Sequence, residues 1–152
     1  MTRARWAAAL TTCLLSSGLG ACAPGPSQPQ DVLEVLAASE RAGDAFTDSA
    51  AQVPEGLVAG SQRSAGQTEA ARYWAAVGTD GEVCLVGFLT GTAPTYAITC
   101  AAPADFAAGG LQLGVSAGGA AADAWLVPDD YDTAALESQG YRSAAANLLT
   151  RP

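Results

Sequence analysis

Three carboxylates lie close together near the C-terminal end of the sequence. Asp129, Asp130 and Asp132 follow Pro128, and carboxylates this close in a chain are able to bind Ca²⁺ or to act as a general acid and base. A proline followed by two aspartates is also ordinary turn chemistry, and no EF-hand spacing of glycine and glutamate follows. The sequence favours a solvated turn, with a metal site at these three carboxylates as the weaker alternative.

The sequence contains neither histidine nor lysine. Without histidine, the common Ser/His/Asp and Cys/His catalytic arrangements are excluded. Without lysine, a Schiff base, a Ser-Lys dyad and a phosphate-loop lysine are excluded as well. We therefore expect no catalytic residues and no cofactor, and a carboxylate-dependent hydrolase is the enzyme class that stays open.

Five aromatic residues could form a binding surface. They are Tyr73, Trp74, Trp125, Tyr131 and Tyr141. Side chains alternate along a strand, so Trp74 should point away from the face of Tyr73, and Trp125 away from the face of Leu126. If Trp74 and Trp125 are exposed, they suit a protein partner or a glycan. The alternative is that both cover the second face of a sheet beneath a helix.

The first 21 residues have the three parts of an export signal. Arg3 and Arg5 precede an apolar stretch at 6–15, and small residues follow. The next feature is Leu19, Gly20, Ala21 and Cys22, which resembles the lipobox of bacterial lipoproteins. That resemblance implies cleavage after Ala21, a lipid on the thiol of Cys22, and a domain held at the outer face of the cell membrane. An ordinary secretory signal is the alternative, and Cys22 would then be a free thiol.

The predicted mature chain has a tether and one acidic domain. Residues 22–30 are rich in proline and polar residues and cannot build a core, so we expect a semi-extended tether before a single domain at 31–152. Without Arg3 and Arg5, five arginines stand against fifteen acidic residues, a formal net charge of −10. This charge opposes binding to nucleic acid or to anionic lipid headgroups.

Cys84 and Cys100 are the remaining pair of cysteines. Cys13 leaves with the predicted signal and Cys22 takes the predicted lipid, so an exported domain retains two thiols in an oxidising location. We expect a disulfide between them. A redox or metal role is the alternative, and neither a CxxC spacing nor a histidine supports it.

The N-terminal part of the domain predicts one helix. Asp31 and Glu34 have the spacing of a capping box, and an apolar stripe follows, so we expect a helix from residue 31 to about residue 43. Glycines and Pro54 interrupt any period from residue 44 to residue 67, which predicts a loop with a short strand near 57–61.

Two hairpins are predicted from alternating apolar residues. Asp80 and Gly81 would form the first turn, which places Tyr73, Ala75 and Val77 on one face with Cys84, Val86 and Phe88. A further turn at 90–94 would set Cys84 opposite Cys100. The second hairpin is predicted for residues 111–126 around Gly118 and Gly119.

The remaining segments complete a mainly β or α+β fold. We expect a short helix or loop at 132–139 and a last strand at 141–149, giving an N-terminal helix on an antiparallel meander of five or six strands. The order of the segments 83–88, 98–100, 125–132 and 147–149 resembles that of small secreted proteins of actinobacteria, in which a Val-Pro-Asp turn follows a disulfide hairpin. The resemblance implies a fold and no activity.

Three functions are compatible with these features. The favoured one is a non-enzymatic lipoprotein of the cell envelope, anchored through Cys22, that binds a protein partner. The second is a binder of a small molecule or of cell-wall glycan on the aromatic face. The third is the carboxylate-dependent hydrolase.

Overall fold

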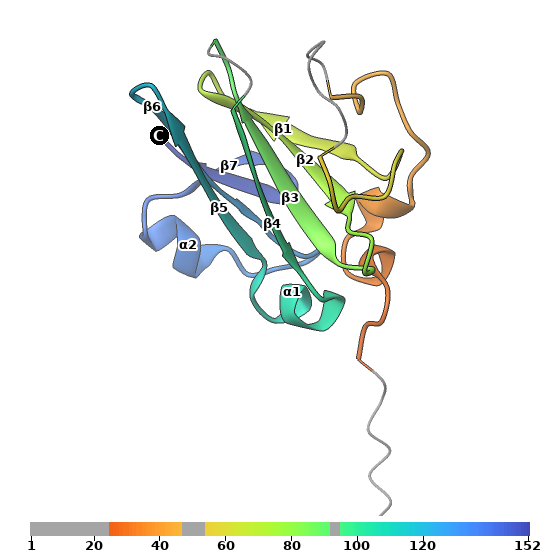
Figure 1. The fold of residues 1–152 in the computed structure, drawn as a ribbon. Helices are drawn as coiled ribbons and strands as arrows, with labels where there is room; N and C mark the ends of the chain where they lie inside the picture. The colour runs from red at the N-terminus through yellow and green to blue at the C-terminus, as the bar shows by residue number, and fades with distance from the viewer. Residues whose placement is uncertain (1–24, 47–53, 92–94) are drawn as a thin grey trace, which may run out of the picture.

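The protein is a two-sheet β structure. The computed structural model describes residues 25–46, 54–91 and 95–152, and its strands form two antiparallel sheets of four (Figure 1). The first sheet has the order β1 (Arg63–Gln67), β2 (Ala71–Val77), β3 (Val83–Leu89), β4 (Tyr96–Ala101). The second has the order β5 (Leu111–Ala117), β6 (Ala120–Leu126), β8 (Leu148–Arg151), β7 (Arg142–Ala145). The helices in the described residues are short: η1 (Pro29–Asp31), η2 (Glu34–Ala37), α1 (Pro103–Gly109) and α2 (Ala134–Ser138).

The main core lies between the two sheets. Alternate residues of β2 and β3 point inward and meet inward residues of β5, β6 and β8, because side chains alternate along each strand. Its largest members include Tyr73, Leu85, Phe106, Leu126 and Leu148, all fully or almost fully buried. The mainly β class with one disulfide is therefore confirmed, and the single meander of five or six strands is wrong.

The β2–β3 hairpin has a different register from the predicted one. Val77 pairs with Val83, so the connection has five residues, and Gly81 lies in it with a φ of 79°. The N–H of Gly81 donates to the carbonyl of Gly78. The N–H of Gly78 also donates to the carbonyl of Glu82, which leaves a turn of three residues, 79–81, where two were predicted. The extra residue moves every side chain of β2 to the other face relative to β3. The predicted common face of Tyr73 and Cys84 is wrong.

The consequence is that both faces of the first sheet are covered. Trp74 and Ala76 share the outer face with Cys84, Val86 and Phe88, where Phe46 and Leu57 pack over them in a second apolar cluster. Every residue of β3 is buried.

The two later hairpins follow the predicted pairings. Cys84 pairs with Cys100 and the two form a disulfide, with 4.1 Å between their Cα atoms. That short distance is typical of a non-hydrogen-bonded cross-strand pair. In the second sheet, Leu113 pairs with Ala124 around the turn at Gly118 and Gly119.

The predicted helix at 31–43 is not formed. The chain makes two 3-10 turns, η1 and η2, separated by Val32 and Leu33, and Leu33 is extended with φ −149° and ψ 92°. Leu33 is completely buried in the main core and Val32 beside it is buried too. Leu33 reaches the core in an extended conformation and not in a helical one, so tertiary packing overrides the local capping signal.

Two further segments differ from the predictions. The expected last strand at 141–149 is a hairpin, β7 and β8, which turns between Ala145 and Leu148. The expected strand near 57–61 is one isolated pairing of Leu57 with Gly78, and the regular strand β1 begins later, at Arg63.

The predicted leader 1–21, the lipid site Cys22 and the start of the tether lie outside the described residues. The described chain enters the domain at Pro29, which is buried in η1. None of the helices in the described ranges is long and apolar enough to cross a membrane.

Candidate functional site: a cleft at one end of the sheets

The aspartates near Pro128 hold the fold together. Asp129 accepts a hydrogen bond from the backbone N–H of Glu34 at 2.7 Å and another from Asn147 Nδ2 at 2.9 Å. Asp132 accepts from the N–H of Ala134 at the start of α2, at 3.1 Å. Asp130 lies in the turn with a φ of 57°. Asp129 and Asp132 thus act as hydrogen-bond acceptors within the fold.

The three aspartates do not converge on one point. Within the described ranges, the only histidine, cysteine and carboxylate atoms gathered closely enough to share a metal ion belong to Glu82, Cys84 and Cys100. The sulfur atoms of this group are bonded to each other.

Trp74 is not at the surface. Only 3% of it is exposed, and its ring packs against Phe46 and Phe88 with centroid distances of 5.3 and 5.5 Å. The covering segment contains Phe46 and Leu57, and is not the expected helix. Trp74 is therefore part of the second core.

Trp125 lies on the outer face of the second sheet and is half-buried. Its ring meets Tyr141 edge-on, with centroids 6.4 Å apart, and Tyr131 and Leu136 pack nearby. Its partners come from α2 and the adjoining loops, so the ring contributes mainly to a third apolar cluster.

A cavity of about 430 Å³ opens at one end of the sheets, which we call the distal cleft. It lies between the β1–β2 turn and the ends of β6, β7 and β8. Its polar lining is Thr68, Glu69, Tyr73, Arg142, Thr150 and Arg151. Its apolar lining is Ala70, Ala121, Ala122 and Pro152. A cavity of this size suits a small ligand or the terminal group of a larger one.

Arg151 is held on the rim of the cleft by two contacts. Its guanidinium lies 4.4 Å from the centroid of the Tyr141 ring, and its Nη2 is 3.9 Å from Asp123 Oδ2. The cation–π contact with the ring favours this position of the guanidinium, whereas the ion pair is long and partly exposed, and exposed pairs contribute little.

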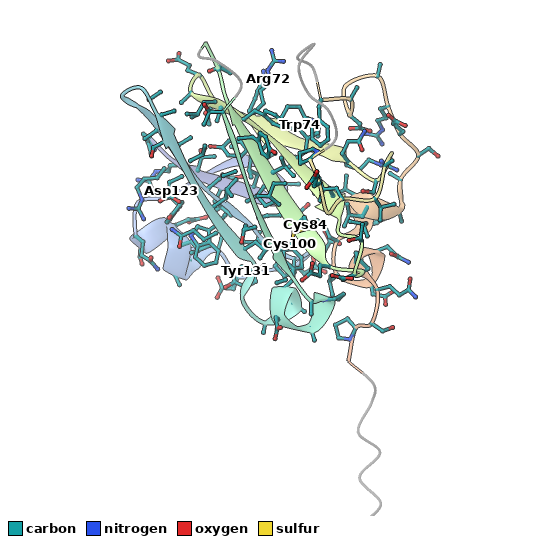
Figure 2. The ribbon with its side chains drawn as sticks, in the orientation of Figure 1. Arg72, Trp74, Cys84, Cys100, Asp123 and Tyr131 are labelled. Carbon is teal, nitrogen blue, oxygen red and sulfur yellow. A yellow bond between two sulfur atoms is a disulfide. The ribbon has the colours of Figure 1, made fainter. Side chains whose placement is uncertain are left out.

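Asp123 lies on β6, where Figure 2 labels it, and is itself held by a small polar network. Tyr141 Oη donates to Asp123 Oδ2 at 2.8 Å, and Gln112 Nε2 donates to Tyr141 Oη at 2.9 Å. Tyr141 is completely buried, so this network fixes the position of the aromatic ring beneath Arg151.

Arg142 is held by backbone carbonyls. Its Nη1 donates to the carbonyl of Tyr141 at 2.9 Å and more weakly to that of Glu137 at 3.4 Å. These contacts use one nitrogen of the fork. The other N–H groups of Arg142 and Arg151 have no partner among the residues that the structure describes, and they are free to bind a ligand.

Tyr73 forms the inner wall of the cleft. It is 1% exposed, and burial raises the pKa of its hydroxyl above the usual 10.0; the Thr68 side-chain hydrogen bond opposes this shift and the charge of Asp123 adds to it. Its hydroxyl is therefore a neutral hydrogen-bonding group at physiological pH. Gly87 stands opposite Tyr73, and a Cβ there would lie 3.3 Å from the tyrosine ring.

The cleft concentrates the rare positive charge of this chain. It is lined by two of the five arginines that follow residue 21, in a sequence with fifteen acidic residues. The sequence interpretation missed Arg142 and Arg151 because it placed Arg142 at the start of a single strand, 141–149, and Arg151 beyond the end of that strand. A hairpin turn near residue 146 brings both to the same end.

Comparison of the chain with models of protein families, with characterised proteins and with solved structures found no match. The function is therefore argued from the site alone.

Proposed function

We propose that this protein is a lipid-anchored, non-enzymatic binding module of the bacterial cell envelope, and that its ligand occupies the distal cleft. The lipobox-like residues Leu19, Gly20, Ala21 and Cys22 support the anchor. Two acyl chains or more give stable membrane attachment, whereas one chain binds only weakly.

The observation that carries this proposal is that the N-terminal segment and the distal cleft lie at opposite ends of the described fold. The described N-terminal segment leaves the fold at the end where α1 lies, while the C-terminal end of β8 and the β1–β2 and β5–β6 turns lie at the opposite end (Figure 1). The cleft is built at that opposite end, from the β1–β2 turn and from β8. A lipid at Cys22 would leave the cleft facing away from the membrane, open to a partner.

The side chains of the cleft favour binding over catalysis. Its arginines stay charged, its tyrosine hydroxyl stays neutral, and Glu69 is the carboxylate among the described lining residues. A hydrolase of the acid and base type would need a second carboxylate facing the same space. The burial of Trp74 also weakens the alternative of a glycan surface made by Trp74 and Trp125.

The anchor is tested by labelling growing cells with a fatty acid that carries an alkyne. The wild-type chain is expected to become labelled and to stay with the membrane, and the Cys22→Ala chain is expected to lose both properties. Label on the Cys22→Ala chain, or none on the wild type, would contradict the lipoprotein proposal.

The binding site is tested by photo-cross-linking in the same cells. A photo-activatable residue replaces Ala121 on the cleft or Ala104 on α1, and both of these alanines are exposed. We expect a discrete product from position 121 that is missing at position 104. Equal products at both positions, or none at position 121, would contradict a ligand in the cleft.

A further inference from the structure

The distal cleft combines hydrogen-bond donors with one strong acceptor. The donors are the guanidinium groups of Arg142 and Arg151, and the acceptor is the carboxylate of Glu69. Resting on the function proposed above, we propose that the cleft binds a carboxylate that stands next to an N–H group, as at the C-terminal end of a peptide or in a free amino acid.

The arginines suit a carboxylate because both are oriented before a ligand arrives. The guanidinium of Arg151 lies over the ring of Tyr141, and Arg142 donates to the carbonyl of Tyr141. Fixed, planar forks match the two oxygens of a carboxylate and lose little entropy on binding. Tyr141 thus contacts both arginines: its ring contacts Arg151 and its backbone carbonyl accepts a hydrogen bond from Arg142.

Glu69 restricts the charge of the ligand. Together with Asp123, which lies 3.9 Å from Arg151, it opposes a second negative charge in the cleft. A dianion such as phosphate is therefore disfavoured relative to a single carboxylate. The same Glu69 is able to accept a hydrogen bond from the amide or ammonium group beside that carboxylate.

The body of the ligand should be small. The apolar wall is made of Ala70, Ala121, Ala122 and Pro152, none of which offers an aromatic ring or a long apolar side chain to a bulky group. Alanine-like residues fit such a wall, and we therefore choose N-acetyl-alanyl-alanine as the probe for a peptide end.

The experiment is an NMR titration of the full chain, expressed with its N-terminal segment and purified in detergent. The probes are N-acetyl-alanyl-alanine, its carboxamide, free alanine, acetate and inorganic phosphate. We expect saturable shifts at the cleft with N-acetyl-alanyl-alanine and none with the carboxamide. If free alanine binds as tightly as N-acetyl-alanyl-alanine, the source of the carboxylate is a free amino acid. If free alanine binds more weakly than the dipeptide, the source is the C-terminal end of a peptide. Acetate, which lacks the N–H, is expected to bind more weakly than either.

Variants separate the specific contribution of Arg142 and Arg151 from that of the overall charge. Arg142→Gln and Arg151→Gln should each weaken binding about tenfold or more, because each removes a charged hydrogen bond. Arg41→Gln removes the same charge from an exposed position outside the cleft and should leave binding unchanged. Arg151→Lys keeps the charge without the planar fork and should show intermediate affinity, which also serves as the folding control.

Equal binding of the acid and the carboxamide, stronger binding of phosphate, or no saturable shift at the cleft with any probe would overturn the proposed ligand class. In that case, a discrete photo-cross-linked product from position 121 would still support the cleft as a binding site. Loss of that cross-link would remove the proposed function as well, so the two failures are distinguishable.

Discussion

The disulfide between Cys84 and Cys100 should supply a large share of the stability of this domain. The cysteines are 16 residues apart, and closing a loop of that length in the unfolded chain corresponds to about 3 kcal/mol. Domains are stable by only about 5–15 kcal/mol in total. Replacing both cysteines by alanine also removes two sulfur atoms from the second core, which adds to this loss.

Thermal and urea unfolding of the Cys84→Ala, Cys100→Ala chain would measure this loss. For a domain of this size, we expect the melting temperature to fall by roughly 10 °C. The reference is the chain that retains both cysteines, and Cys22→Ala in both chains removes a competing thiol. A fall of less than about 3 °C would refute the reasoning, because the pairing of β3 with β4 would then be stable without a covalent link.

Three further outcomes are expected from the same unfolding measurements. Gly110→Ala should cost about 1–3 kcal/mol, since φ is 70° and the new Cβ would lie 2.6 Å from the carbonyl oxygen of Leu126, whereas Gly109→Ala meets open space and should be close to neutral. Because the folded pKa of Tyr73 is raised, stability should be complete below pH 10.0 and fall as the pH rises through the folded pKa, and Tyr73→Phe should flatten that fall. An unchanged alkaline slope in Tyr73→Phe would assign it to other groups. Asp129→Ala should cost about 1–3 kcal/mol, because it removes the acceptor for the N–H of Glu34 in the N-terminal segment and for Nδ2 of Asn147 in the β7–β8 turn; no change in urea midpoint would mean that water replaces both hydrogen bonds.

The hairpins that were predicted correctly have a signal in both their turn and their alternation. Gly118 and Gly119 both adopt positive φ, as a two-residue turn requires, and the flanking strands alternate without interruption. The pairing of Cys84 with Cys100 had a third signal, because a disulfide requires that the two residues be opposite each other. Where independent constraints agreed, the register was determined.

The β2–β3 register had only one signal. Asp80 and Gly81 are compatible both with a two-residue turn and with a longer turn that places Gly81 in the left-handed region. Both faces of β3 are buried, so alternation could not choose between the two registers. Local sequence therefore identified the turn but not its length.

The predicted N-terminal helix failed for a different reason. Its capping signal was local, whereas the partner of the Glu34 N–H is Asp129, far along the chain. Such a contact exists only after the second sheet is in place, and sequence spacing contains no information about it. The same limit hid the distal cleft, whose arginines come together only through the β7–β8 turn.

The register of β2 links these observations to the proposed site. The extra residue in the β2–β3 connection turns Tyr73 inward, opposite Gly87, and turns Trp74 outward, onto the face of the disulfide. A bulky residue at position 87 would meet Leu113 at 2.7 Å as well as the tyrosine ring, so glycine leaves the room that Tyr73 needs between the sheets. With the predicted register, the tryptophan would occupy that space and the cleft would lack the tyrosine hydroxyl. One residue in a surface turn therefore decides which aromatic side chain packs in the second apolar cluster and which one lines the distal cleft.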